Sequence, residues 1–438
     1  MNCNQQKSTE ALLRFIENSP TAFHAVETVA ERLVAEGFTC LREGDAWDLT
    51  PGEGYFVTRN QSSVIAFRLP ENAPEHFLIA ASHTDSPMFK LKSRSERVAC
   101  EHYIRLNTEV YGGTILSSWL DRPLTLAGRV ILSRDGVFSA KTVKIDRDLL
   151  LIPNVAIHLN RSVNSGYTFN PAVDMLPLFA EKGEGKDALL NLMAEELSCA
   201  VEEIAGMDLY VVCRTPGTVW GAGYEFFSSP RIDNLMCAFG TLEGFCHTKN
   251  PNAVTVYYAA DNEETGSSTK QGAASVFLSD VLDRICESIG ADKRRLLASS
   301  MMVSADNGHA KHPNHPELSD AENSPRLNGG VVIKFNAAQK YATEGVSCAI
   351  FSEICRRADV PIQYYANRSD MPGGSTLGSI SNTQVPLLTV DIGMAQLAMH
   401  SCYETAGARD TDYLIRAMDA FYNASLTTDA DGVYRLNS

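Results

Sequence analysis

Apolar positions in the first part of the chain recur first with helical and then with strand spacing. The periodicity predicts one helix over about 8–18 and a second over about 22–35, separated by the helix-breaking pair Ser19-Pro20. Two extended runs follow, 54–58 and 63–68, with the polar turn segment 59–61 between them. We therefore expect two helices followed by a β-hairpin.

Farther along, three short apolar runs each lead directly into polar residues. The runs and their followers are 77–81 with His83 and Asp85, 254–260 with Glu263 and Glu264, and 300–305 with Asp306. Helical patterns lie between and after such runs, one of them from about Gln271 to Ile289, and this is the alternation of an α/β fold. In parallel α/β sheets ligands bind at the carboxyl ends of strands, so we expect a site where these runs end.

The predicted secondary structure changes over residues 90–223. Short strands with turns predominate there, and one helix is predicted from Lys186 to about Ile204. This β-rich block interrupts the α/β pattern, which predicts an inserted domain. We therefore expect a discontinuous α/β domain formed by 1–89 and 224–438, with 90–223 inserted as the second domain.

Composition narrows the class of protein. The 438 residues carry a formal charge of −15, which argues against nucleic acid as a partner. Eleven scattered cysteines without a C-x-x-C pair fit free thiols in a reducing compartment. The polar N-terminus lacks an apolar signal core, and no apolar run is long enough to span a membrane. We expect a cytoplasmic protein without a membrane partner.

Each candidate site residue has an ordinary structural alternative. Glu263 and Glu264 could divide the tasks of holding a metal and moving a proton, or could be two solvated surface acids. His83 and Asp85 lie on one face of an extended backbone, where the carboxylate can orient a metal-bound histidine. The same H-x-D pattern also fits a turn before proline.

Two further candidates are equally open when taken alone. Asp233 precedes a helical pattern and could cap that helix or bind a metal. His158 follows an apolar run, and a hydrogen-bonded structural histidine is the alternative to a catalytic one. The histidines of 309–315 are interrupted by Pro313, which favours a loop near the site over a helical metal-binding motif.

Taken together and in this order along the chain, the candidate histidine and acidic residues are typical of a site for two metal ions. Two divalent ions about 3.5–4 Å apart need a shared carboxylate and further ligands for each ion. Imidazole together with carboxylate suits zinc, with manganese or cobalt as alternatives. One remaining glutamate could then take the proton of the attacking water.

Longer stretches with a recognisable sequence occur along the whole chain: 82–87 (SHTDSP), 119–124 (WLDRPL), 126–130 (LAGRV), 156–161 (AIHLNR), 231–234 (RIDN), 261–267 (DNEETGS), 309–314 (HAKHPN), 373–378 (GGSTLG) and 398–401 (AMHS). In these stretches, and over essentially its whole length, the sequence resembles a bacterial-type member of the aspartyl aminopeptidase family of dinuclear zinc metallopeptidases. The resemblance implies a three-layer α/β/α zinc-peptidase catalytic domain and an inserted dimerisation or lid domain. It also implies removal of N-terminal acidic residues from peptides.

The resemblance assigns roles residue by residue. It implies that Asp233 bridges two metal ions, that His83 and Asp306 complete one, and that Glu264 and His400 complete the other. Glu263 would be the general base and Asp85 the partner of His83. Lys334, with Tyr341 beside it, would meet the acidic side chain of the substrate. His158 would reach the active site of a neighbouring subunit in a tetrahedral dodecamer built from dimers.

Three positions depart from the family pattern without touching an expected ligand. Tyr403 stands where arginine is usual, Gly373 where cysteine often occurs, and Lys340 where arginine is common. These departures concern substrate preference more than hydrolysis. A neutral aminopeptidase or a dinuclear metal deacylase therefore stays an alternative, as does a non-catalytic peptide-binding protein.

Overall fold

The chain forms two compact units in a computed structural model that describes residues 2–183 and 187–437. The first unit comprises Met1–Asp85, Gly217–Met399 and Glu404–Ser438, and the second comprises Ser86–Pro216 and His400–Tyr403. The sequence placed the boundaries at 89/90 and 223/224, and it did not separate 400–403 from the residues around them. Among the described residues, no helix is long and apolar enough to cross a membrane.

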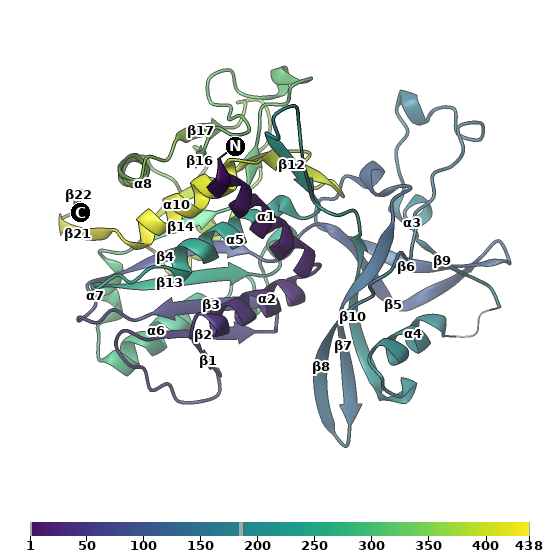
Figure 1. Ribbon diagram of the computed structural model, residues 1–438, viewed down its shortest axis with the longest axis horizontal. Coiled ribbons are helices and arrows are strands. Elements are labelled where there is room, and N and C mark those ends of the chain that lie inside the picture. The colour runs from purple at the N-terminus through teal and green to yellow at the C-terminus, as the bar shows by residue number, and fades with distance from the viewer. Residues whose placement is uncertain (1, 184–186, 438) are drawn as a thin grey trace. The chain divides into compact units, whose positions relative to one another are not determined.

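A nine-stranded mixed sheet is the centre of the first unit (Figure 1). Its strand order is β1-β2-β3-β13-β4-β14-β18-β16-β17. Four neighbours, β13, β4, β14 and β18, run parallel, so their carboxyl ends share one edge. The strands are β1 (Thr39–Leu41), β2 (Gly54–Arg59), β3 (Ser63–Arg68), β13 (Ala253–Ala260), β4 (His76–His83), β14 (Met301–Ala305), β18 (Leu388–Gly393), β16 (Val331–Phe335) and β17 (Ile362–Ala366).

Helices cover both faces of this sheet, which confirms the expected three-layer α/β/α arrangement. Alternate residues of β4 enter two different cores: Leu78 and Ala80 face one helix layer, and Phe77 and Ile79 face the other. This two-sided burial explains why the central strands are continuous apolar runs. One layer holds α1 (Cys3–Asn18), α2 (Ala22–Ala35), α5 (Ile232–Cys246), α8 (Gly345–Arg357) and α10 (Asp410–Tyr422), and the other holds α6 (Phe277–Ile289), α7 (Lys293–Leu297) and α9 (Leu377–Ser381).

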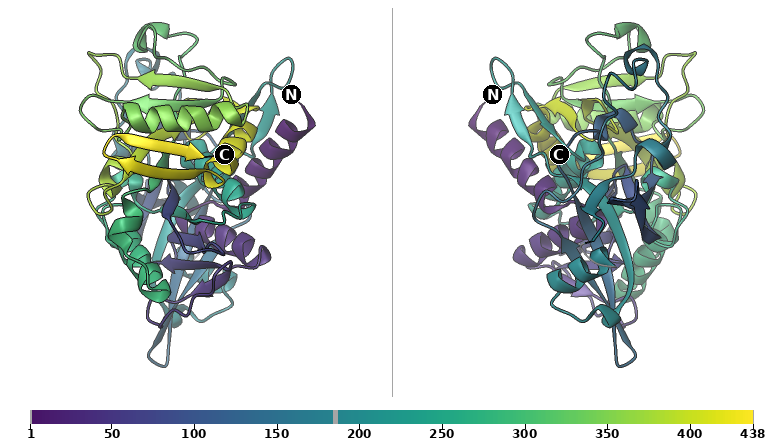
Figure 2. Two further views of the ribbon diagram at one scale, coloured as in Figure 1. Left: turned by 90° about the vertical axis from the view of Figure 1, so that its left-hand side faces the viewer. Right: turned by 90° about the vertical axis from the view of Figure 1, so that its right-hand side faces the viewer.

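Two smaller sheets complete the first unit. One has the order β11-β12-β20-β19-β15, with strands of only two to four residues. The other is a C-terminal hairpin beside α8, drawn in yellow in the left view of Figure 2, and Arg357 of α8 donates to the Leu436 carbonyl. The strands are β11 (Thr218–Trp220), β12 (Phe226–Ser229), β20 (Glu404–Gly407), β19 (Ala395–Leu397), β15 (Gly308–His309), β21 (Ser425–Ala430) and β22 (Val433–Asn437).

The second unit is built on a six-stranded antiparallel sheet of order β8-β7-β10-β5-β6-β9. Its core combines sheet residues such as Leu126 and Val211 with Met193 of α4. The elements are β5 (Met88–Ala99), β6 (Tyr103–Tyr111), β7 (Leu124–Arg134), β8 (Val137–Lys144), β9 (Leu178–Glu181), β10 (Ile204–Cys213), α3 (Pro171–Asp174) and α4 (Ala188–Glu196).

The helix expected from Lys186 to about Ile204 is shorter than predicted. α4 ends at Glu196, and Ile204 instead begins β10, where it pairs with Leu132 of β7. The β-branched side chain of Ile204 is well suited to a strand, and pairing with the neighbouring strand β7 decides its conformation. The predicted start at Lys186 lies outside the described residues.

Candidate metal centre

The parallel strands of the first unit bring four of the predicted site residues to one edge of the sheet. His83 is the last residue of β4, and Asp306 follows β14 directly. Glu263 and Glu264 lie in a short 3₁₀ turn three residues after β13. Because β13, β4 and β14 are adjacent and parallel, side chains that follow their carboxyl ends converge.

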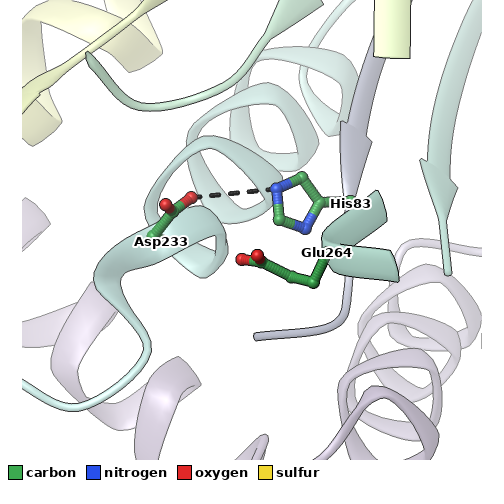
Figure 3. Close-up of side chains that lie close together, drawn as sticks. All are labelled: His83, Asp233 and Glu264. Carbon is green, nitrogen blue, oxygen red and sulfur yellow. Dashed lines mark ion pairs between the residues drawn. The ribbon is translucent and has the colours of Figure 1, made fainter. Parts of the chain in front are cut away.

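Asp233 joins this group from the start of α5 and is only 3% exposed. Donor atoms of His83, Asp233 and Glu264 all lie within 4.8 Å of one another, and Figure 3 shows the three side chains pointing toward a common space. His83 Nε2 is 3.7 Å from Asp233 Oδ1 and 3.6 Å from Asp306 Oδ1. It is also 3.9 Å from Glu263 Oε2.

Asp85 orients both His83 and the two glutamates. His83 Nδ1 lies 3.0 Å from the Asp85 carbonyl oxygen and 3.3 Å from its Oδ1. A carbonyl oxygen only accepts, so Nδ1 carries a proton, and Nε2 is the ring nitrogen that faces the carboxylates. The Asp85 carboxylate also accepts the backbone N–H groups of Glu263 and Glu264, each at 3.2 Å.

Burial and the closeness of several acidic side chains shift the pKa values of Glu263, Glu264 and His83. Burial, reinforced by the negative charges of Asp306, Asp85 and Asp233, raises the pKa of Glu263 to about 8. Burial and the charge of Asp233 raise the pKa of Glu264 well above its ordinary value. Burial alone would lower the pKa of His83, but its hydrogen bonds to Asp306 and Asp85 raise it overall. Such mutual repulsion favours a bound cation.

The donor set fits a divalent transition metal. One imidazole and several carboxylates from separate elements can each supply a ligand atom without a large backbone change. Imidazole with carboxylate oxygen is the combination that zinc, manganese and cobalt share. His83, Asp233 and Glu264 form the one group of metal-ligand type found among the described residues. The histidines of the 309–315 loop are not part of it.

Lys334 of β16 is 2% exposed and lies beside the acids. Its Nζ donates to the Asn307 carbonyl at 3.2 Å and is 3.6 Å from Asp306 Oδ2. Burial alone would lower the pKa of Lys334, but the charge of Asp306 outweighs it, so the pKa is raised and the cation persists. Tyr341 covers it, with Nζ 5.2 Å from the ring centroid.

Two predicted site residues belong to the second unit. His400 Nδ1 lies 3.0 Å from the Gly113 carbonyl oxygen, which fixes the proton on Nδ1 and the lone pair on Nε2. His158 is exposed in a turn between Ile157, which is 49% exposed, and Leu159, which is 83% exposed. Their predicted roles stay predictions.

Sequence reasoning missed four buried polar residues beside the acids. They are Asn234, Asn307, Gln396 and Glu404, each at most 3% exposed. A signal was available for the first two, because an asparagine directly follows both Asp233 and Asp306. Gln396 and Glu404 lie in short strands, and no local pattern distinguishes them.

Comparison with known proteins gives matches along nearly the whole chain. The family described as aminopeptidase I zinc metalloprotease (M18) matches residues 15–422. A "Probable M18 family aminopeptidase 2" of Clostridium acetobutylicum is 43% identical over 430 residues, covering 96% of this chain and 99% of that protein.

Solved structures agree in fold. The structure of a complex of Ape4 and Nbr1 matches with a TM-score of 0.92 and 37% identity, covering 96% of this chain and 86% of that one. The dodecamer of mApe1 from S. cerevisiae matches with a TM-score of 0.85 and 26% identity, covering 96% of this chain and 97% of that one.

Proposed function

Since this chain belongs to the aminopeptidase I zinc metalloprotease (M18) family, we propose that it removes single N-terminal residues from peptides and prefers aspartate and glutamate. Metallo-aminopeptidase activity follows from the family. The acidic preference and the division of labour among the residues go beyond it. The observation that carries the proposal is the convergence of His83, Asp233, Asp306, Glu263 and Glu264 at one sheet edge.

We propose two divalent metal ions per subunit, most simply zinc. Asp233 would be shared, with His83 and Asp306 holding one ion and Glu264 the other. His400 as the remaining ligand rests on the sequence resemblance, because it belongs to the second unit. When bound, such ions polarise a carbonyl group and lower the pKa of bound water toward neutrality.

The chain's own residues then position and move the proton. Glu263 takes the proton of the attacking water and passes it to the leaving amine. Its backbone N–H is held by Asp85, which also orients His83, so base and ligand keep a fixed relation. Its Oε2 lies 3.9 Å from His83 Nε2, next to the proposed metal ligands, which supports Glu263 in this role.

The acidic preference is supported by the buried charge of Lys334. A substrate carboxylate close to this ammonium group would gain a charge-assisted interaction that a neutral side chain cannot make. Lys334 already interacts with Asp306, so it would link substrate recognition to a proposed metal ligand. Tyr341 limits access to Lys334 by covering it.

Rates with matched substrates test the proposal. We expect the purified chain to hydrolyse an Asp-peptide faster than the corresponding Leu-peptide and to leave an N-acetylated peptide intact. A faster Leu-peptide would indicate a neutral aminopeptidase, and cleavage of the acetylated peptide would indicate a deacylase. Absence of hydrolysis with metal bound would indicate a binding protein.

A further inference from the structure

Two buried asparagines connect the elements that carry Asp233 and Asp306. Each directly follows one of the acids: Asn234 is 0% exposed at the start of α5, and Asn307 is 3% exposed beyond β14. The two acids lie 73 residues apart in the sequence. Their separation in space therefore depends on tertiary bonds between these two elements.

The two side-chain amides bond reciprocally. Asn234 Nδ2 donates to the Ala305 carbonyl at 2.8 Å, and Ala305 directly precedes Asp306. Asn307 Nδ2 donates to the Ile232 carbonyl at 3.0 Å, and Ile232 directly precedes Asp233. Carbonyl oxygens only accept, so the donors are unambiguous. Each asparagine thus holds the backbone just before the other acid.

A further series of hydrogen bonds connects Asn307 to the other side of the Ile232–Asp233 peptide. Asp233 N–H donates to Glu404 Oε2 at 3.0 Å, and Glu404 Oε1 accepts from Gln396 Nε2 at 3.2 Å. Gln396 Oε1 in turn accepts from Asn307 Nδ2 at 2.7 Å. Both polar atoms of the Ile232–Asp233 peptide are therefore held by this network. Water cannot readily replace these bonds, because the side chains are at most 3% exposed.

We propose that Asn234 and Asn307 are positioning residues that set the spacing of the Asp233 and Asp306 carboxylates and thereby set metal affinity. This inference rests on the proposed function, in which both acids bind metal. Neither asparagine offers an atom to the metal in this account; each acts through the backbone beside the opposite ligand. Residues that hold metal ligands in place are worth about 10- to 100-fold in metal affinity.

Asn250 provides a matched control in the same unit. It is 7% exposed, and its Nδ2 donates to the carbonyls of Tyr422 and Ala424 at 2.9 and 2.8 Å. It therefore makes the same kind of buried amide-to-backbone bonds at the end of α10 and just after it. Its Oδ1 accepts the N–H groups of Asn252 and Ala253 at the start of β13, so none of its partners adjoins Asp233 or Asp306. Replacing Asn250 should cost stability in the same way without displacing the proposed metal ligands.

The experiment compares Asn234→Leu, Asn307→Leu and Asn250→Leu in the full chain, with Zn²⁺ alone as the probe. We expect the first two variants to bind zinc about 10- to 100-fold more weakly in competition with a chelator. Asn250→Leu should keep wild-type zinc affinity, and the Tm of all three metal-free variants should fall to a similar extent. Wild-type affinity in both Asn234→Leu and Asn307→Leu, or an equal loss in Asn250→Leu, would overturn the inference.

Smaller replacements cover the case in which a leucine variant does not fold. Asn234→Ser and Asn307→Ser shorten the side chain beyond hydrogen-bonding reach with less steric change, and the same weakening is expected. If these also lack a folded metal-free state, the asparagines serve stability and the positioning role is wrong. A wild-type chain that takes up no zinc would instead contradict the proposed function.

Discussion

Glu263 and Glu264 are adjacent in the sequence and held by the same carboxylate, yet we assign them different work. Asp85 accepts one backbone N–H from each, which fixes the start of both side chains. Glu264 belongs to the group with donor atoms within 4.8 Å of one another, whereas Glu263 Oε2 approaches His83 Nε2 to 3.9 Å. This arrangement supports a ligand role for Glu264 and a proton-transfer role for Glu263.

Glu263→Gln separates these two roles. The amide cannot accept the water proton, so we expect kcat to fall by about 10²- to 10⁴-fold. Zinc content measured by atomic emission should stay at the wild-type value, because the substituted amide keeps the shape of the original side chain. A variant with near-normal turnover would contradict Glu263 as the base. Loss of zinc would instead show that it is a ligand.

Lys334→Met tests the acidic pocket. The substitution keeps the length of the side chain but removes its charge, so we expect kcat/KM for an Asp-peptide to fall at least about tenfold more than for a Leu-peptide. Lys249→Met is the control, because Lys249 is exposed and follows the end of α5 that is opposite Asp233. Equal losses for both substrates would mean that Lys334 serves Asp306 rather than the substrate.

At this scale, sequence reasoning reached the side chains that follow apolar strands and missed those that act through tertiary bonds. His83, Glu263, Glu264 and Asp306 come together because the strands before them are parallel neighbours, a rule that can be applied to a sequence. The partners of Gln396 and Glu404 depend on how distant backbones approach, which no local pattern encodes.

Among the elements, strand β4 carries a buried titratable group at the end opposite the site. His76 begins this strand and is 0% exposed, and neither of its ring nitrogens has a hydrogen-bond partner among the described residues. Burial lowers its pKa from 6.5 to about 4. The folded state therefore disfavours the protonated ring.

The sign of the resulting pH dependence follows from this depressed pKa. Above pH 6.5 the ring is neutral in both the folded and the unfolded state, and its contribution to stability is fully present. As the pH falls from 6.5 toward about 4, the unfolded state binds the proton first, and the loss of stability reaches about 2 kcal/mol by pH 5. His76→Leu should remove this part of the pH dependence. Urea unfolding of the variant and the wild type at pH 7.5 and pH 5 measures it. His247→Leu, at an exposed position, should retain the wild-type difference.

The elements themselves were predicted where local signals act alone. Helix α2 has the predicted bounds, and β2 and β3 form the predicted hairpin. Helix α6 was expected from about Gln271 but begins at Phe277. The Gln271 carbonyl accepts the hydroxyl of Ser63, and its side chain donates to Asn262, so the loop's tertiary bonds hold this residue outside the helix. The two- to four-residue strands of the five-stranded sheet are too short to show a period.

For the molecule as a whole, the sequence indicated an inserted β-rich block, but the placement of 400–403 required the structure. His400 bonds the Gly113 carbonyl, and Cys402 N–H donates to Ser118 Oγ, so this short segment groups with the second unit. Those contacts join residues more than 280 positions apart. Sequence pattern and composition cannot reveal that two segments so far apart in the chain are in contact.

The segment around His158 bears on assembly. Val155, Ile157 and Leu159 expose 50%, 49% and 83% of their surface, and such exposed apolar groups are typical of protein contacts. Asp121 braces the start of the segment by accepting the backbone and side-chain N–H groups of Asn154. We propose that this segment lies at a contact between copies of this chain. Leu159→Asp should then shift the mass distribution to smaller species.

Complementation between two inactive variants tests whether His158 acts in a neighbouring subunit. His158→Ala and Glu263→Gln should each have low activity as pure assemblies. In co-expressed mixtures, a Glu263→Gln subunit can supply its intact His158 to a His158→Ala subunit that keeps Glu263. Random pairing makes about a quarter of the sites complete, so activity should exceed that of either parent. A mixture no more active than its parents, with both variants present in one assembly by mass spectrometry, would place His158 outside its neighbour's site. The result does not depend on substrate preference, so it tests the assembly separately from the acidic pocket.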